Sequence, residues 1–304
     1  MPGSSSTARS RVFAPKCPSR YLPRVRLRLR RERFLVGLRG LALLRGWPFD
    51  KAEVADAQLE AVRSVVSGSD EQSSAIIDVD ELPVGNAYAA WSETYDGPNP
   101  LIEVEEPVVR KFLDGTEAGV ALDVACGTGR HARLLGDLGH RVIALDASSE
   151  MLVRARTNAP GAALVRGDFN RLPIHDQSID VLVCTLALTH VRALRQPVAE
   201  LARVLRPGGH LILSDIHPVA VATGAHAFFV RPDGSRGVTR NEIHWASEYV
   251  SAFRAADLMI EQAAEPTFEQ SFVEDMPDAA IRDAAREAVV GLPFALVWRV
   301  RKAS

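Results

Sequence analysis

The stretch LDVACGTGRHA, residues 122–132, decides the fold of this chain. It runs from apolar residues typical of a buried strand, through Gly127 and Gly129, into a segment with helical character. Glycine has no Cβ, so these positions allow a tight turn and a close approach of a ligand to the backbone. A helix that begins near Thr128 directs free N–H groups and the positive end of its dipole toward that ligand. The stretch therefore predicts a strand, a ligand-binding loop and a helix.

The same alternation of strand and helix continues along the chain. Continuous apolar segments predict strands at 119–126, 140–148, 163–169, 179–188 and 210–216. Helical segments lie between them at 128–139, 149–159 and 194–209. Strands that are apolar on both faces and separated by helices indicate a parallel sheet covered on both sides, with right-handed crossovers. The predicted fold class is α/β, a doubly wound and mostly parallel sheet.

The segments on either side of this core complete the expected domain. Helices are predicted at 86–96, 101–115, 245–258 and 278–290, an extended segment at 259–270 and a last strand at 294–302. Pro-Asp-Gly at 232–234, between β-favouring segments, predicts a hairpin-like insertion. A closing strand after these elements suits a seven-stranded, Rossmann-like sheet.

The N-terminal part differs in composition from the rest. Residues 1–50 contain 12 Lys and Arg but 2 Asp and Glu, with the arginine-rich run RYLPRVRLRLRRERF, and residues 68–85 are acidic. We expect residues 1–85 to be a disordered basic extension with an acidic linker. A globular domain is then expected at 86–304, with its core at 119–216 and a substrate-side insertion and closing strands at 217–304. An arm that contacts RNA or an acidic membrane surface, or a targeting peptide, is the alternative.

Bulk composition limits the class of protein. Of 304 residues, 47% are hydrophobic and 24% charged, which is ordinary for a soluble globular protein. Beyond residue 50 the chain has 24 basic and 36 acidic residues, which argues against a nucleic-acid substrate held by its phosphates. No uncharged apolar run is long enough to suggest a membrane span. The three scattered cysteines, Cys17, Cys126 and Cys184, suit free thiols and a cytoplasmic location.

The loop alone leaves its ligand open. The pattern G-T-G-R-H-A fits the dinucleotide fingerprint G-x-G-x-x-G/A, but it also fits a loop that holds the methionine end of S-adenosylmethionine. Asp146 lies 17 residues beyond Gly129, a suitable distance for a carboxylate that accepts ribose hydroxyls. Both cofactors contain a ribose. Asp146 could instead cap a helix, a role for which Ser148 and Ser149 compete.

Four sequence blocks in order separate the two ligands: LDVACGTGR, ALDASSEML, GDFNRLPIHDQSID and LARVLRPGGHLILSD. With these blocks the chain resembles the class I S-adenosylmethionine-dependent methyltransferases, in particular the methyltransferase type 11 branch, over about residues 86–304. The usual D/E-x-G-x-G-x-G opening has Ala125 in its first glycine position. The dehydrogenase fingerprint requires neither GDF nor LRPGG.

The resemblance implies a role for each matching residue in binding S-adenosylmethionine. Asp123 orients the loop or approaches the methionine amine, and Gly127, Thr128 and Gly129 line the amino-acid portion. Asp146 holds the ribose, and Ala147 and Met151 lie beside the adenine. Asp168 accepts a hydrogen bond from the exocyclic amino group of the adenine, and Phe169 packs on the adenine ring. The main chain near Thr185 and Leu186 faces the amino group of the cofactor, and Tyr95 closes over it.

The resemblance also implies methyl transfer to a small-molecule acceptor by in-line displacement. Since ligands bind beyond the carboxyl ends of parallel strands, His190 and His217 should overhang the cleft, and His244 could reach the same mouth. These three histidines are the candidates for substrate contact or proton acceptance, with His217 favoured; hydrogen-bonded structural histidines are the alternative. Their spacing does not indicate a metal site.

Aromatic residues are candidates for the walls of an acceptor site, although each could equally pack in the core: Tyr88, Trp91, Phe228 and Phe229. Two other functions stay open: a nicotinamide-dependent oxidoreductase with the same fold, and a non-catalytic cofactor-binding or RNA-associated protein that uses the basic arm. No membrane partner is expected, and the sequence leaves the oligomeric state open.

Overall fold

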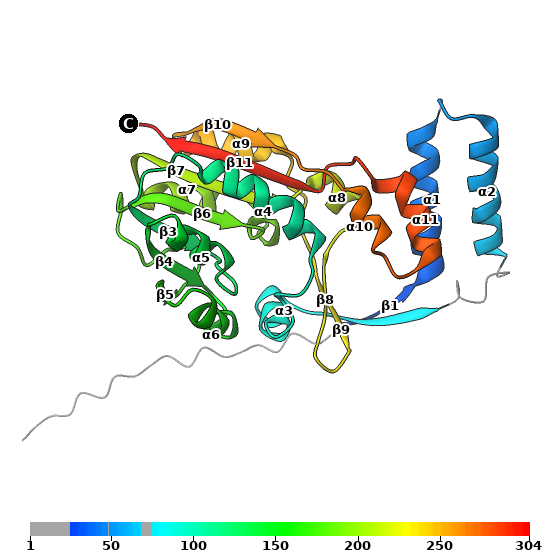
Figure 1. Ribbon diagram of the computed structural model, residues 1–304, viewed down its shortest axis with the longest axis horizontal. Helices are drawn as coiled ribbons and strands as arrows, with labels where there is room; N and C mark the ends of the chain where they lie inside the picture. The colour runs from blue at the N-terminus through cyan, green and yellow to red at the C-terminus, as the bar shows by residue number, and fades with distance from the viewer. Residues whose placement is uncertain (1–24, 48, 68–74) are drawn as a thin grey trace, which may run out of the picture.

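The computed structural model describes residues 25–47, 49–67 and 75–304. Its main feature is a seven-stranded sheet in the order β10-β11-β7-β6-β3-β4-β5 (Figure 1). The strands are β3 (Val120–Val124), β4 (Arg141–Asp146), β5 (Ala163–Arg166), β6 (Ile179–Thr185), β7 (Leu205–Ile216), β10 (Leu258–Ala264) and β11 (Ala295–Lys302). β11 pairs antiparallel with β7 and with β10, whereas the pairs from β7 through β5 are parallel. The predicted fold class is confirmed.

Helices cover both faces of this sheet, which is why its central strands β3 and β6 are largely apolar and buried. One face packs on α4 (Pro100–Leu113), α5 (Arg130–Asp137) and α6 (Ser149–Asn158). The other packs on α7 (Arg195–Val204) and α9 (Ala246–Ala255). Side chains alternate along β3, so Ala121 is buried on the α5 side and Leu122 on the α7 side. The order of strands brings the C-terminal ends of β3, β4, β6 and β7 to one edge, where a ligand is expected.

Three element boundaries differ from those expected from sequence. β6 ends at Thr185, Leu186 has a φ of 53°, and a short 3₁₀ turn, η2, spans Leu188–His190. The helix expected at 194–209 ends as α7 at Val204, and LRPGG already belongs to β7. Proline and glycine disfavour a helix there, and Gly208 has a positive φ of 78°. Within the expected extended segment 259–270, β10 ends at Ala264, and α10 (Gln270–Glu274) follows.

A second, four-stranded sheet lies beside the main one, in the order β1-β2-β9-β8. β8 (Ala227–Val230) and β9 (Arg236–Thr239) form an antiparallel hairpin, which confirms the predicted insertion. β1 (Val25–Arg30) and β2 (Ile76–Glu81) extend this sheet, and β2 runs parallel to β9. α3 (Val84–Trp91) follows β2, and α8 (Pro218–Ala222) leads into the hairpin. The insertion is therefore anchored to the N-terminal segment.

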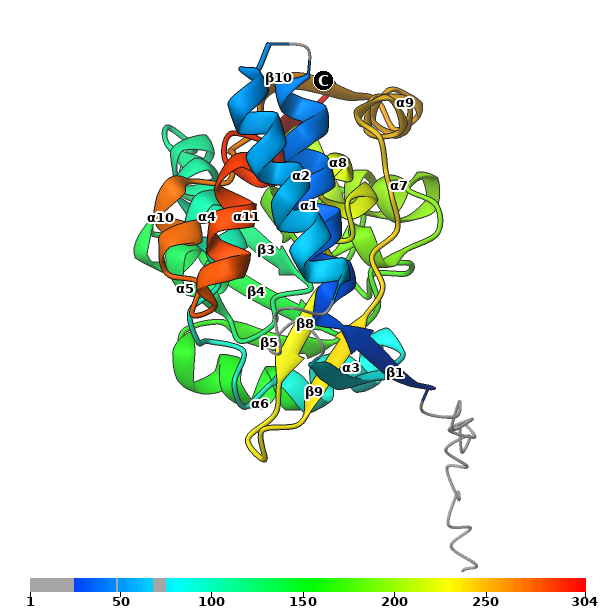
Figure 2. The ribbon, with the colours of Figure 1, turned by 90° about the vertical axis from the view of Figure 1, so that its right-hand side faces the viewer.

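The described part of residues 25–85 is ordered, unlike the disordered extension expected from composition. α1 (Arg31–Gly46) and α2 (Ala52–Val66) pack with α11 (Ala279–Val289), as Figure 2 shows from that side. Their small core contains Leu35, Leu38, Ala42, Val273, Ala284, Ala285 and Ala288. The apolar residues of α1 recur at helical spacing, but the arginines between them dominate the composition, which made the segment look like a solvated arm. Residues 1–24, 48 and 68–74 of the expected extension lie outside the described residues.

Two further expectations concern the cysteines and membrane-spanning helices. Cys126 and Cys184 are buried free thiols, whereas Cys17 lies outside the described residues. Across residues 25–47, 49–67 and 75–304, no helix is long and apolar enough to cross a membrane.

Candidate functional site

The loop between β3 and α5 has the conformation that its glycines allow. Gly127 has a φ of 53° and Gly129 a φ of 90°, both in the left-handed region. A Cβ at residue 129 would lie 3.2 Å from the Cα and Cβ atoms of Ala155, so the loop also approaches α6 closely there. Ala125, in the first glycine position of the motif, likewise has a positive φ of 56°. The loop thus turns sharply at the C-terminal edge of β3 and begins α5 at Arg130.

Ion pairs fix the start of α5. Arg130 contacts Glu105 at 3.3 Å and Glu106 at 3.1 Å, both on α4. Glu105 is fully buried and also accepts a 2.6 Å hydrogen bond from Ser214 on β7. Burial raises the pKa of Glu105, and the guanidinium of Arg130 opposes that shift. This network holds the loop and its helix against the sheet.

Asp146, at the end of β4, faces the glycine loop. Its Oδ2 accepts a 2.8 Å hydrogen bond from the backbone N–H of Gly127, and its Oδ1 accepts one of 2.8 Å from Ser148. Ser148, and not Asp146, caps α6, because its Oγ accepts from the N–H of Met151. Burial raises the pKa of Asp146, and these backbone hydrogen bonds counteract the shift. The half-buried carboxylate is therefore held at the mouth of the loop, where the ribose role was expected.

Asp123 on β3 is a buried carboxyl group without a full set of partners. It is 2% exposed, and its Oδ2 has no hydrogen-bond partner among the described residues. Burial raises its pKa to about 8. An acidic group in this state gains most from a cationic ligand group, which would restore its charged form.

The remaining residues expected to bind the cofactor differ in accessibility. Ala147 and Asp168 are exposed beyond β4 and β5, and Asp168 Oδ1 accepts from the backbone and side chain of Asn170. Phe169 is half-buried against the main core. Met151 is fully buried and packs inside the protein, so the structure places it behind the site rather than on its surface.

Thr128 and Thr185 are held by other side chains. Thr128 is 1% exposed and its hydroxyl donates a 2.5 Å hydrogen bond to Asp96, beyond α3. Thr185 Oγ1 lies 3.0 Å from Nδ1 of His131, the second residue of α5. These contacts tie the glycine loop to the segment after α3 and to the end of β6.

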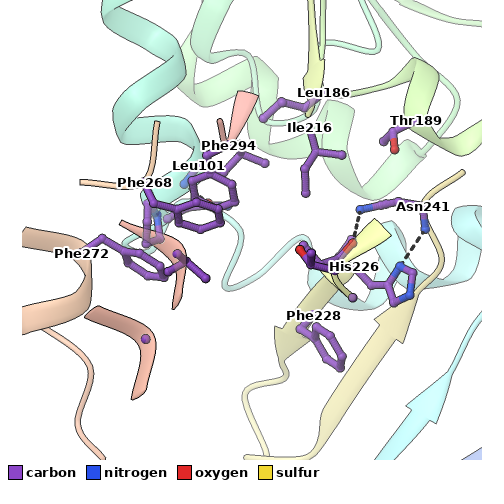
Figure 3. A pocket seen from close by; sticks show the side chains of 18 of the residues that line it. Leu101, Leu186, Thr189, Ile216, His226, Phe228, Asn241, Phe268, Phe272 and Phe294 are labelled. Atoms are coloured by element: carbon purple, nitrogen blue, oxygen red, sulfur yellow. Dashed lines mark hydrogen bonds between the residues drawn. The ribbon is translucent and has the colours of Figure 1, made fainter. Parts of the chain in front are cut away.

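Tyr95 connects this loop to a cavity. A Cβ at residue 127 would lie 3.8 Å from Cε1 of Tyr95, and Tyr95 packs on Trp91 and Tyr88 with ring centroids 4.9 and 6.1 Å apart. Tyr88, Trp91, Tyr95 and Leu186 all line a cavity of about 720 Å³. Figure 3 shows this cavity from close by, with Leu186 labelled. Phe228 lines it as well, whereas Phe229 is buried and stacks on Trp91. The segment of α3 and Tyr95 therefore forms a wall between the loop and the cavity.

Of the three candidate histidines, His190 is the one that lines the cavity. Its Nδ1 lies 3.2 Å from the carbonyl oxygen of Arg240, which can only accept, so Nδ1 donates. The neutral ring then accepts at Nε2, where the hydroxyl of Tyr88 donates over 2.7 Å. Burial lowers the pKa of His190, so the ring is neutral at neutral pH and its Nε2 is free of a proton. Asp215 supports its position by accepting from the N–H of Thr189 and from the hydroxyl of Tyr249.

Neither His217, which was expected to overhang the cleft, nor His244, which was expected to be able to reach its mouth, is among the residues that line the cavity. His217 is 7% exposed, caps α8 by accepting from the N–H of Val219, and has its Nε2 3.5 Å from Glu265. His244 is 4% exposed and donates a 2.7 Å hydrogen bond to the carbonyl of Val191. Both serve local structure, because a ring nitrogen of each is engaged with a nearby backbone group. Among the described residues, no cluster of His, Cys, Asp or Glu could hold a metal ion.

Several lining residues were missed from sequence. His226 and Asn241 lie together across the cavity, where Nδ1 of His226 accepts from the N–H of Asn241 (Figure 3). Phe34, Leu38 and Leu41 of α1 also line the cavity. These lining residues come from different parts of the sequence, so no local pattern indicates that they lie around one cavity. For α1, its helical apolar spacing was the signal that could have been used.

The loop and its surroundings fit S-adenosylmethionine. The unpartnered, buried Oδ of Asp123 suits the methionine ammonium group, and the carboxylate of Asp146 suits the ribose hydroxyls. At Gly127 the absence of a side chain leaves backbone open toward Tyr95. Each feature is a property of this chain's own residues, and together they match the charges and hydroxyls of that cofactor.

Comparison with known proteins agrees with this geometry. Residues 122–213 match the model of the methyltransferase domain family Methyltransf_11. A malonyl-[acyl-carrier protein] O-methyltransferase of Yersinia pestis is 34% identical over 46% of this chain and 52% of its own length. A demethylmenaquinone methyltransferase of Beutenbergia cavernae is 33% identical over 51% of this chain and 68% of its own length. The chain thus spans about half the length of the Yersinia relative and two thirds of the Beutenbergia relative.

A solved structure shares the fold. An S-adenosylmethionine-dependent methyltransferase from Mesorhizobium loti superposes with a TM-score of 0.53 at 24% identity, over 68% of this chain and 99% of the other. The matched domain, the order of strands and the sequence relatives lead to one conclusion. The chain belongs to the class I S-adenosylmethionine-dependent methyltransferase family, whose cofactor is S-adenosylmethionine.

Proposed function

We propose that this protein transfers the methyl group of S-adenosylmethionine to a small-molecule acceptor bound in the 720 Å³ cavity. The observation that carries the proposal is that Tyr95, which lies against Gly127 of the glycine loop, lines this cavity together with Tyr88, Leu186 and His190. Its size falls within the range typical of small-molecule sites, about 300–1,000 Å³. A lining of mostly apolar and aromatic side chains suits a small organic molecule rather than a nucleic acid.

Residues at the ends of β3, β4 and β5 would hold the cofactor. Asp123 would neutralise the ammonium group, the loop from Gly127 to Gly129 would lie along the amino-acid portion, and Asp146 would accept from the ribose. Asp168 and Phe169 stay predictions for the adenine. When bound, S-adenosylmethionine supplies a methyl group activated by its positively charged sulfur.

The wall formed by α3 and Tyr95 would orient the acceptor. In-line displacement needs the acceptor atom roughly 3 Å from the methyl carbon, aligned with the bond that breaks, and shielded from water. Tyr88 is held on two sides, by its hydrogen bond to His190 and by its ring contact with Trp91 at 5.7 Å. These contacts fix the aromatic surface against which an acceptor would lie.

The Tyr88–His190 pair gives this wall a route for a proton. An acceptor hydroxyl that gains the methyl group must lose its proton. The proton can pass to the oxygen of Tyr88 while the Tyr88 proton moves to Nε2 of His190, over the 2.7 Å hydrogen bond. The lowered pKa of His190 keeps Nε2 free to receive it at neutral pH. His190 is therefore the proposed base.

The relatives act on acceptors of two kinds, according to their names: a malonyl group on an acyl carrier protein, and demethylmenaquinone. For this chain we favour a free small molecule, because the lining of the cavity is mostly apolar and uncharged. Family membership favours S-adenosylmethionine over a nicotinamide cofactor. Use of the arginine-rich N-terminal segment to bind RNA stays a prediction.

A labelling experiment tests this function. Full-length protein is incubated with S-adenosylmethionine labelled in its methyl group and a metabolite extract, and the label is followed by mass spectrometry. We expect label in one or a few small compounds, and at least a tenfold lower rate for His190→Gln. Label confined to macromolecules, or none at all while S-adenosylhomocysteine still binds, would overturn the small-molecule proposal.

A further inference from the structure

The lining of the cavity changes from polar to apolar along its length. At one end lie the hydroxyl, imidazole and amide groups of Tyr88, Thr189, His190, His226 and Asn241, among which Tyr88 bonds to His190 and Asn241 to His226. The opposite end is formed by Leu101, Phe268, Phe272 and Phe294, gathered on one side in Figure 3. The rings of Phe268 and Phe294 stack with centroids 3.7 Å apart. The cavity is therefore amphipathic, with its polar end next to the proposed reaction centre.

The apolar end is closed by a helix outside the matched methyltransferase domain. Phe34, Gly37, Leu38 and Leu41 of α1 line it, together with Met276, Ala285 and Val289, which pack beside α1. Phe34 is 53% exposed although it faces this cavity, and a Cβ added at Gly37 would meet no atom within 4 Å. α1 thus leaves apolar surface and free space here, which a helix serving only to pack would fill.

Contacts at both ends hold α1 in this position. At its start Arg31 is 8% exposed and donates to both carboxylate oxygens of Asp278, at 2.7 and 2.8 Å. At its end Arg45 donates to the carbonyl oxygens of Glu287 and Ala288.

Among the described lining residues, Arg33 is the only one with a permanent charge, and it is exposed. Apart from this exposed guanidinium, the described lining offers no permanent positive charge to a phosphorylated or strongly anionic acceptor.

We propose that the acceptor is amphipathic: a polar head that carries the reacting atom at the Tyr88–His190 end, and an elongated hydrocarbon tail against α1 and the phenylalanines. This inference rests on the proposed function and names its substrate class. The N-terminal helix would then be a specificity element, which measures the length of the tail. Each methylene moved from water onto this surface should improve binding about fourfold, from about 0.8 kcal/mol per buried CH₂.

Calorimetric titration tests whether the apolar end binds a hydrocarbon tail. Full-length protein saturated with S-adenosylhomocysteine is titrated with a homologous series of 4-alkylphenols, from 4-methylphenol to 4-octylphenol. We expect affinity to rise about fourfold per methylene until the apolar end is full. Gly37→Leu places four carbons in that space, so it should weaken octylphenol on the order of 100-fold and leave methylphenol unchanged. Gly40→Leu is the matched control, since residue 40 lies on the same helix, has open space for a Cβ and is not among the lining residues.

Affinity independent of chain length, or equal losses in the two glycine variants, would overturn the inference. The two proposals can fail separately. Chain-length-dependent binding with no methyl transfer in the extract experiment would contradict the proposed function alone. Transfer in the extract to a compound that lacks a hydrocarbon tail would contradict the acceptor class alone. Thermal melting of each variant, with and without S-adenosylhomocysteine, verifies that the cofactor site is intact.

Discussion

The substitution Gly129→Ala tests whether the loop needs glycine for the reasons the structure gives. Residue 129 has a φ of 90°, and an added Cβ would lie 3.2 Å from two atoms of Ala155 and 3.4 Å from Cβ of Ala159. The left-handed conformation costs a residue with a side chain about 1–2 kcal/mol. The tight contact with α6 adds to this cost, and the lower entropy of the unfolded alanine chain returns about 0.4–1 kcal/mol. We expect a net destabilisation of about 1–3 kcal/mol.

Gly136→Ala is the matched control on α5. A Cβ at residue 136 would meet no atom within 4 Å, and its φ is not in the left-handed region. Alanine in a helix is favoured over glycine by about 0.5–1 kcal/mol, so this variant should gain stability. The melting temperatures of the two variants should therefore differ by roughly 3–16 °C, since about 1 kcal/mol moves the midpoint by 2–4 °C in a domain of this size.

The assay is thermal unfolding of both variants beside the unmodified protein, followed by calorimetric titration with S-adenosylhomocysteine. For Gly129→Ala we expect weaker binding in addition to the lower midpoint, because relief of the contact moves the loop. For Gly136→Ala binding should be unchanged. If Gly129→Ala matches Gly136→Ala in both stability and affinity, the reasoning about the loop is refuted.

Three further predictions follow from groups around the site. Asp146→Ala should weaken S-adenosylhomocysteine about 10–100-fold in a titration, because hydrogen bonds to a charged group are worth about 1.5–3 kcal/mol; unchanged affinity would remove Asp146 from the site. Burial lowers the pKa of His190 below its usual 6.5, so kcat/KM should fall with decreasing pH only below that value, and His190→Gln should lack this acidic limb; a limb that persists in the variant would assign it to another group. Hydrogen bonding from Arg31 lowers the pKa of Asp278 from 3.8 to about 2, so its stabilising contribution is complete above about pH 4 and is lost as pH falls toward 2. Asp278→Asn should therefore melt at a lower temperature at pH 7 and lose less stability between pH 4 and 2, and parallel stability curves would contradict this.

The fold of the core was predictable because its signals are local. Apolar strands such as 119–126 and 179–185, separated by helices, suffice to indicate a parallel sheet covered on both faces. The N-terminal segment was not predictable in the same way. Leu35, Leu38 and Ala42 are buried only because α11, about 240 residues later in the chain, presents Ala284 and Ala288 to them. The charged residues of α1, such as the exposed Arg33, dominate its composition and conceal the apolar residues of its buried side.

The same difference between local and long-range signals separates the site residues that could be predicted from those that could not. Gly127, Gly129 and Asp146 could be placed from spacing, since each occurs at a strand end in a recurring order. The histidines could not, because position after a strand does not determine where a side chain points. His217 turns to cap α8, whereas His190 is directed into the cavity by its partners Tyr88 and Arg240, from elements remote in sequence.

The central claim is that the glycine loop binds the methionine end of S-adenosylmethionine. Its most direct test is calorimetric titration of the full-length protein with S-adenosylhomocysteine and, separately, with NAD⁺ and NADP⁺. We expect one S-adenosylhomocysteine per chain, with binding weakened by Asp146→Ala, and no detectable heat from either dinucleotide. Binding of a dinucleotide without binding of S-adenosylhomocysteine would contradict the account.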